Sequence, residues 1–106
     1  MAALMIVLTT MPDDDRAESL ARALVTERLA ACVHVHAAMT SVYEWQGQVE
    51  VQPERQIVIK TTEDRLPDLE QRLRALHPYE LPELVTLEAS ASAEYSAWVE
   101  ARTRKS

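Results

Sequence analysis

Apolar positions in the first part of the chain follow a strand pattern and then a helical pattern. The run Leu4 to Thr9 is short, aliphatic and rich in β-branched residues, which is typical of a strand buried on both faces. From about Asp14 to Arg28 the apolar residues recur at helical spacing, which predicts an amphipathic helix. The acidic run Asp13 to Asp15 suits the start of that helix, because carboxylates cap helices and offset their positive end. These aspartates could also bind a hard cation, but the helix start accounts for them fully.

A long hairpin is predicted next. Ala31 to Trp45 alternates in strand fashion, Gln46-Gly47 suits a tight turn, and Val49 to Thr61 returns along it. We expect Pro53 to mark a bulge or an edge, because proline cannot donate to a ladder. Strands of roughly 13 to 15 residues far exceed the usual length of about 5 to 6, so this hairpin would overhang its own domain. Another copy of the chain would cover it most simply, and we therefore expect a homo-oligomer.

The last part of the chain predicts two helices and a short strand. Thr62 can cap a helix with a leucine stripe from Leu66 to Leu76, Leu84 to Leu87 reads as a strand, and Ser92 can cap a final helix. The order strand, helix, strand, strand, helix, strand is the ferredoxin-like βαββαβ arrangement, here with an extra C-terminal helix. We expect an α+β fold in one domain, residues 1–106, with two helices covering one face of an antiparallel sheet.

The amino-acid composition argues against several classes of function. The net charge of −6 argues against nucleic acid and anionic membranes as partners, because both attract basic surfaces. The single cysteine, Cys32, excludes an internal disulfide and fits a reducing compartment. The single glycine excludes a glycine-rich phosphate loop. No nucleophile motif or fixed carboxylate pair is present, so we expect no enzymatic activity.

Six short segments, in order and at fitting spacing, carry a family resemblance. The chain resembles the CutA family of divalent-cation tolerance proteins over nearly its whole length. The matching segments are TTMPD (9–13), LAACV (29–33), SVYEWQG (41–47), IKT (59–61), HPYELPE (77–83), and Tyr95 with Trp98.

The resemblance implies a ferredoxin-like subunit in a compact homotrimer built by the long hairpins. It also implies a bacterial protein of the cytoplasm, or otherwise intracellular, that is linked to tolerance of copper and other divalent metals. The implied trimer resembles the PII signalling proteins in shape, which bind small ligands in clefts between subunits.

The segment LHPYELPELV (76–85) holds the candidate metal ligands. The resemblance makes His77 and Glu83 the matching histidine and glutamate of a copper(II) or other divalent site, weakly bound, beside a cleft between subunits. Imidazole favours copper, nickel and zinc. Thr9 stands where some family members have a cysteine, and a hydroxyl is a poorer copper ligand than a thiolate. The alternative is a helix cap and turn, with His77 stabilised at the negative helix end.

A second candidate site would serve a PII-like signalling module. Lys60, Tyr79 and Glu80 are the expected residues of a ligand cleft, with Lys60 holding a small anion or metabolite. A solvated lysine is the simpler alternative.

Two further groups of side chains are better explained by packing than by ligand binding. Cys32, His34 and His36 share one strand face and could meet one ion, although alternate residues are about 6.5 to 7 Å apart. We interpret Cys32 as a small packed residue instead. Polar-tipped aromatics favour interfaces, so we expect Tyr43, Trp45 and Trp98 to anchor the trimer or the core.

These observations predict a copper or divalent-cation tolerance protein. The alternatives from other classes are a PII-like small-ligand signalling module and a trimeric scaffold that presents its surface to a partner protein.

Overall fold

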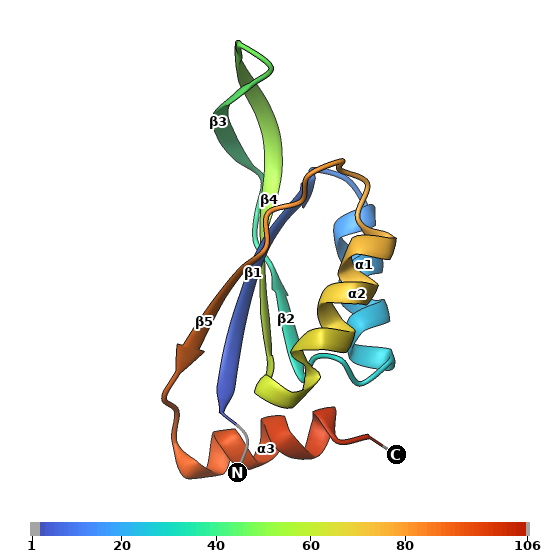
Figure 1. The fold of residues 1–106 in the computed structure, drawn as a ribbon, viewed down its shortest axis with the longest axis vertical. Helices are drawn as coiled ribbons and strands as arrows, with labels where there is room; N and C mark the ends of the chain where they lie inside the picture. The colour runs from blue at the N-terminus through green and yellow to red at the C-terminus, as the bar shows by residue number, and fades with distance from the viewer. Residues whose placement is uncertain (1–2, 106) are drawn as a thin grey trace.

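Figure 1 shows the computed structural model, which describes residues 3–105. The elements in chain order are β1 (Leu4–Pro12), α1 (Arg16–Thr26), β2 (Cys32–Val35), β3 (Met39–Trp45), β4 (Gln48–Thr62), the short 3-10 helix η1 (Glu63–Arg65), α2 (Leu66–Leu76), β5 (Val85–Ala89) and α3 (Ala93–Thr103). Within these residues, no helix has both the length and the apolar character needed to cross a bilayer.

The sheet has the ferredoxin-like topology. Its strand order is β2-β4-β1-β5, and β3 also pairs with β4. All pairings are antiparallel, with β1 between β4 and β5. Sequence neighbours β1 and β2 are therefore separated by β4, which is the split arrangement. The predicted α+β fold with an extra C-terminal helix is confirmed.

Helices α1 and α2 lie side by side on one face of the sheet (Figure 1). The core between these layers contains Val7, Ile57 and Ile59 from the strands and Leu24 and Leu73 from the helices, all fully buried. Alternate strand residues point to one face, so the residues between them point to the face without α1 and α2.

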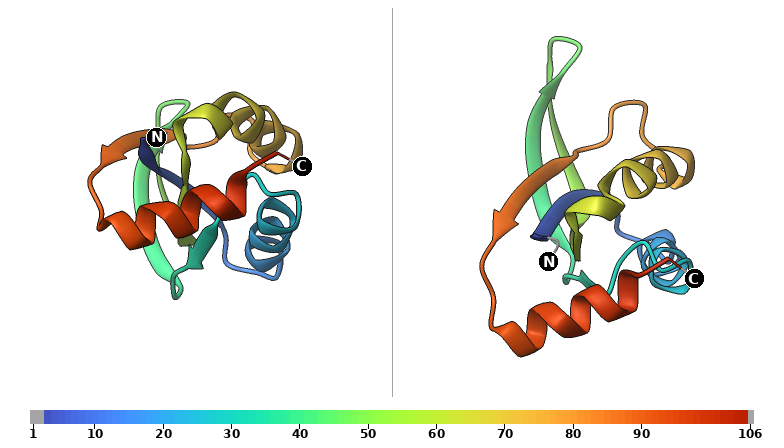
Figure 2. Two further views of the ribbon diagram at one scale, coloured as in Figure 1. Left: turned by 90° about the horizontal axis from the view of Figure 1, so that it is seen from below. Right: turned by 60° about the horizontal axis from the view of Figure 1, so that its bottom comes forward.

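Helix α3 crosses the end of the sheet at the opposite extreme from the hairpin tip (Figures 1 and 2). Its Val99 packs with Leu4 and Ala31 in a second small core. The predicted cap is present, because Ser92 Oγ accepts a hydrogen bond from the backbone N–H of Tyr95 at 3.1 Å.

The predicted strand Ala31 to Trp45 is broken, which corrects the sequence prediction. Val35 pairs with Ile57 and Met39 pairs with Glu54, so the three residues 36–38 face only 55 and 56. One extra residue in one strand is a β-bulge, which bends that strand. The partner strand β4 nevertheless continues unbroken for 15 residues and pairs with both pieces. The hairpin therefore still projects beyond the sheet, and the molecule measures 45 Å along its longest axis (Figure 1).

Two local features of the hairpin agree with the sequence. Gln46 and Gly47 have φ angles of 53° and 81°, the left-handed pair that a type I′ turn requires. Pro53 lies immediately beyond Glu54, the last β4 residue paired with β1. Its missing N–H therefore falls on a two-stranded part of the ribbon, as predicted for an edge.

Two predicted helix caps differ in detail. Thr62 precedes η1 rather than α2, and its side chain makes no cap hydrogen bond. Its hydroxyl lies 3.3 Å from that of Thr103 instead, which ties β4 to α3. Before α1, Asp15 occupies the cap position without a side-chain cap, whereas Asp14 Oδ1 accepts from the N–H of Arg16 at 3.0 Å.

Candidate functional site

An open groove lies between the base of the projecting hairpin and the loop that follows α2. Its volume is about 870 Å³, within the range of about 300 to 1,000 Å³ usual for ligand sites. Strands β3 and β4 of the hairpin supply one wall, and the proline-bounded loop supplies the other. The lining residues are Thr10, Met39, Ser41, Val42, Tyr43, Trp45, Glu54, Gln56, Pro78, Tyr79, Glu80, Leu81, Pro82 and Glu83.

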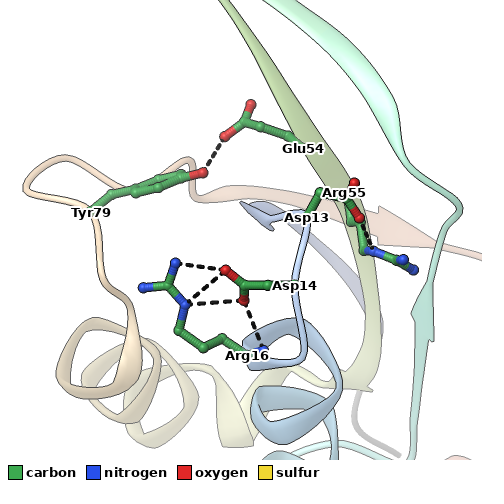
Figure 3. Close-up of polar contacts among 6 residues, drawn as sticks. All are labelled: Asp13, Asp14, Arg16, Glu54, Arg55 and Tyr79. Atoms are coloured by element: carbon green, nitrogen blue, oxygen red, sulfur yellow. Dashed lines mark hydrogen bonds and ion pairs between the residues drawn. The ribbon is translucent and has the colours of Figure 1, made fainter.

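The closest polar contact in the groove joins Tyr79 to Glu54. The Tyr79 hydroxyl donates to Oε2 of Glu54 at 2.6 Å, and the residue Glu54 is only 6% exposed (Figure 3). Burial of the phenol, together with the hydrogen bond and negative charge of Glu54, raises the pKa of Tyr79 well above its usual value. The tyrosine is therefore held in its neutral, hydrogen-bond-donating form.

His77 is buried at the C-terminal end of α2 and is hydrogen-bonded through both ring nitrogens. Nε2 lies 2.8 Å from the carbonyl of Thr10 and 3.2 Å from Oγ1 of Thr9, while Nδ1 accepts from the N–H of Tyr79 at 3.2 Å. This pattern fits a neutral imidazole with the proton on Nε2. Burial lowers the pKa of His77 and outweighs the raising effects of Thr10 and the Glu54 charge. His77 occupies the C-cap of α2, as the cap-and-turn alternative expects, but burial disfavours its charged form.

Gln56 connects the candidate ligand Glu83 to the sheet. The Nε2 amide of Gln56 donates to the carbonyl of Thr9 at 2.7 Å and to Oε2 of Glu83 at 3.2 Å. Thr9 is therefore linked to His77 directly and to Glu83 through Gln56. The sequence predicted His77 and Glu83 as metal ligands and Thr9 as a weaker substitute for a cysteine on the first strand. Thr9 pairs with Ile57 and Gln56 pairs with Thr10, so the side chains of Thr9 and Gln56 point to opposite faces of the sheet.

The acidic run beside the groove is used in ion pairs. Arg55 Nε lies 2.8 Å from Asp13, and Arg16 forms a bidentate contact with Asp14 (Figure 3). The Arg16 hydrogen bonds hold the pKa of Asp14 below its usual value. These contacts support the helix-start explanation over a hard-cation site.

The family model described as CutA1 divalent ion tolerance protein matches residues 5–102. The chain belongs to the CutA1 family.

Individual relatives agree with this assignment. The divalent-cation tolerance protein CutA of Thermus thermophilus is 44% identical over 99 residues, which cover 92% of this chain and 96% of the relative. The chloroplastic protein CutA of Arabidopsis thaliana is 35% identical across 93% of this chain, and the chain spans 55% of that longer protein. The crystal structure of CutA1 from Ehrlichia chaffeensis superposes with a TM-score of 0.93 at 28% identity, covering 99% of both chains.

Within this CutA1 chain, Lys60 is not at the groove. It pairs with Ile6 and Cys32 near the α3 end of the sheet, and its Nζ lies 5.4 Å from the centroid of the Tyr95 ring. Six residues of extended strand, about 20 Å, separate it from Glu54. The predicted cleft of Lys60, Tyr79 and Glu80 is thus divided, because only the latter two line the groove.

The expected aromatic anchors are not core residues of the single chain. Tyr43, Trp45 and Trp98 are each about two-fifths exposed. Tyr43 and Trp45 line the groove, whereas Trp98 stacks on Tyr95 at a centroid distance of 5.7 Å. Cys32 is half-buried, so it is not a core anchor either.

Cys32 and His34 approach each other on the edge strand β2. Cys32 Sγ lies 3.5 Å from Nε2 of His34. This distance is shorter than the roughly 6.5 to 7 Å that separates alternate residues along a strand. Within residues 3–105, no three or more His, Cys, Asp or Glu side chains are grouped so as to hold one ion.

Glu54 and Gln56 are the site residues that sequence reasoning missed. Both lie in the polar segment between Pro53 and the apolar run that begins at Ile57. From the sequence alone, a glutamate inside a long strand is expected to be solvated. Glu54 is buried only because the loop after α2 packs against it. The available signal was the alternation of β4, which places residues 54 and 56 on one face.

Proposed function

We propose that this CutA1 chain acts in divalent-cation tolerance as a homotrimer that binds copper(II) or a similar divalent ion weakly. The observation that carries the proposal is that His77 and Glu83 are both linked to Thr9, directly and through Gln56, in a chain whose relatives are named for divalent-cation tolerance. The reducing compartment favoured by a single Cys32 makes the cytoplasm the proposed location.

The weakness of the proposed site has a physical reason. Both nitrogens of His77 already have hydrogen-bond partners, and Glu83 is held by Gln56. A metal ion that recruits the imidazole must displace either the Thr10 carbonyl or the Tyr79 N–H. Glu83 is the more accessible ligand, so we expect it to make the first contact and water to complete the coordination.

Calorimetric titration with Cu(II) tests this site. Glu83→Gln and His77→Ala should each weaken binding, whereas Glu63→Gln should not. The control Glu63→Gln also removes one negative charge, but Glu63 lies in η1, which follows the C-terminal end of β4. Unchanged binding in both site variants, with the fold verified by circular dichroism, would eliminate the site.

The proposed trimer is supported by apolar surface that the single chain leaves uncovered. Val42 and Val51, which pair across the projecting hairpin, are 66% and 60% exposed. On the sheet face without α1 and α2, Leu87 pairs with Ile6 and is also exposed. Exposed apolar residues of this kind are typical of protein interfaces.

Sedimentation velocity tests the assembly. At micromolar concentration we expect one species of three 12.0 kDa chains. Leu87→Glu should dissociate it, whereas Thr86→Glu, on the opposite face of β5, should leave it intact. A monomeric wild-type protein would refute the trimer.

A second function, that of a PII-like small-ligand module, is favoured by the groove itself. A divalent ion needs only a few oxygen or nitrogen ligands. A volume of about 870 Å³ with aromatic walls offers room for an organic molecule.

A further inference from the structure

The projecting hairpin joins the rest of the sheet at one narrow place. On one side of β4, strand β1 pairs with it as far as Glu54, and on the other side the bulge at 36–38 separates β2 from β3. A bulge disrupts the hydrogen-bond ladder locally and bends its strand. The direction in which the hairpin leaves the sheet is therefore set at residues 54–56 and at the bulge opposite them.

Two consecutive β4 residues hold this place from opposite faces of the sheet. Glu54 accepts the hydrogen bond of Tyr79 from the loop after α2. Arg55 points to the other face, because neighbouring strand residues alternate, and it lies opposite the core residue Met11. Figure 3 shows both contacts, from Tyr79 to Glu54 and from Arg55 to Asp13.

The Arg55 guanidinium joins two separate segments of the chain. Its Nε donates to Oδ1 of Asp13, just beyond the end of β1, at 2.8 Å, and its Nη1 donates to the carbonyl of His36, in the bulge, at 3.4 Å. The side chains of Arg55 and Asp13 are 34% and 30% exposed. The pair is thus partly shielded from water, where opposite charges attract more strongly. One side chain therefore ties the bulge to the end of β1.

We propose that the Asp13–Arg55 ion pair is a brace that fixes the direction of the projecting hairpin and thereby strengthens the association of sister chains. The inference rests on the proposed homotrimer, in which sister chains cover the hairpin. Without the guanidinium, the carbonyl of His36 loses this donor and the hairpin can swing about the bulge. A hairpin that samples several directions must lose that freedom on association, which weakens binding.

Amide hydrogen exchange tests the brace directly. The backbone N–H of His36 donates to the carbonyl of Gln56 at 3.0 Å, so its exchange reports opening at the bulge. Arg55→Gln should speed this exchange at least about 5-fold. Arg72→Gln is the matched control, because Arg72 pairs with Glu27 at the same distance of 2.8 Å and with similar exposure, but on the helices. It should leave the exchange of His36 unchanged.

Sedimentation equilibrium over a range of protein concentrations tests the consequence for assembly. The midpoint concentration of dissociation should rise at least about 5-fold in Arg55→Gln and stay unchanged in Arg72→Gln. Asp13→Asn removes the same ion pair from its other side and should have a similar effect. The double variant should add little to either single change, because both remove one interaction. Asp13→Asn also carries the test if Arg55→Gln fails to fold.

The two measurements separate the brace from the trimer. Unchanged exchange of His36 in both single variants would show that the ion pair does not hold the bulge. Faster exchange with unchanged dissociation would show that the direction of the hairpin does not limit association. Either result would overturn the proposal. A monomeric wild-type protein would refute the homotrimer, and with it the effect on association, while the exchange of His36 would still decide whether the brace exists.

Discussion

The Tyr79 hydroxyl donates a 2.6 Å hydrogen bond to the buried carboxylate of Glu54, joining the loop after α2 to the middle of β4. This bond fixes the spacing of the two groove walls. His77 supports the same loop from below through the backbone N–H of Tyr79. The groove is therefore held by a polar network that begins on β1, crosses the loop and ends on β4.

Tyr79→Phe should destabilise the fold. It leaves an acceptor oxygen of Glu54 buried without a donor, which costs about 1 to 3 kcal/mol in free energy of unfolding. Tyr43→Phe is the matched control, because Tyr43 loses the same atom from an exposed side chain. Urea unfolding of both variants measures the difference, and equal stabilities would show that the Glu54 contact contributes nothing.

His77 should make stability depend on pH. Its pKa in the folded protein lies below the unfolded value of about 6.5, so the unfolded chain binds a proton first as pH falls. Stability is therefore fully present above pH 6.5 and declines as pH falls below it. Denaturation profiles from pH 8 to pH 5, a range of about 3 units around this pKa, should be flatter for His77→Gln than for the wild type. The exposed His34→Gln should keep the wild-type slope, and parallel curves for all three proteins would contradict the assignment.

Gly47→Ala should destabilise the hairpin although space is available. A Cβ at this position would meet no atom within 4 Å, but φ is +81°. A left-handed conformation costs a residue with a side chain about 1 kcal/mol. Gln46→Asn, at the neighbouring left-handed position, should instead preserve or raise the melting temperature, because asparagine tolerates this conformation. A neutral Gly47→Ala would show that the turn can change type freely.

Ser92→Ala should lower stability by about 1 kcal/mol, because it removes the cap of α3. Ser96→Ala makes the same chemical change inside the helix, where alanine is the better helix former, and should be neutral or stabilising. Thermal unfolding of the two variants should therefore shift in opposite directions. A loss in both would indicate that packing, and not capping, governs this helix.

Much of the fold is readable from local patterns. The helical spacing before Arg28, the leucine stripe of α2 and the Ser92 cap are properties of short segments, and each is present in the structure. The bulge at 36–38 is different, because it depends on how β2 and β3 share the single partner strand β4. The residue types at 36–38 do not indicate how these strands pair with β4.

The candidate site, like the fold, was predictable from the sequence only in part. Its ingredients, a histidine, a tyrosine and acidic residues between two prolines, could be recognised in the segment 77–83 because side-chain chemistry is written residue by residue. Which of these side chains contact one another could not be recognised from the sequence. Folding brings Glu54 under Tyr79, occupies both nitrogens of His77 and leaves Lys60 about 20 Å away along the strand. Such pairings join residues distant along the chain, and the burial that sets their charge states exists only after the sheet and the loop have packed together.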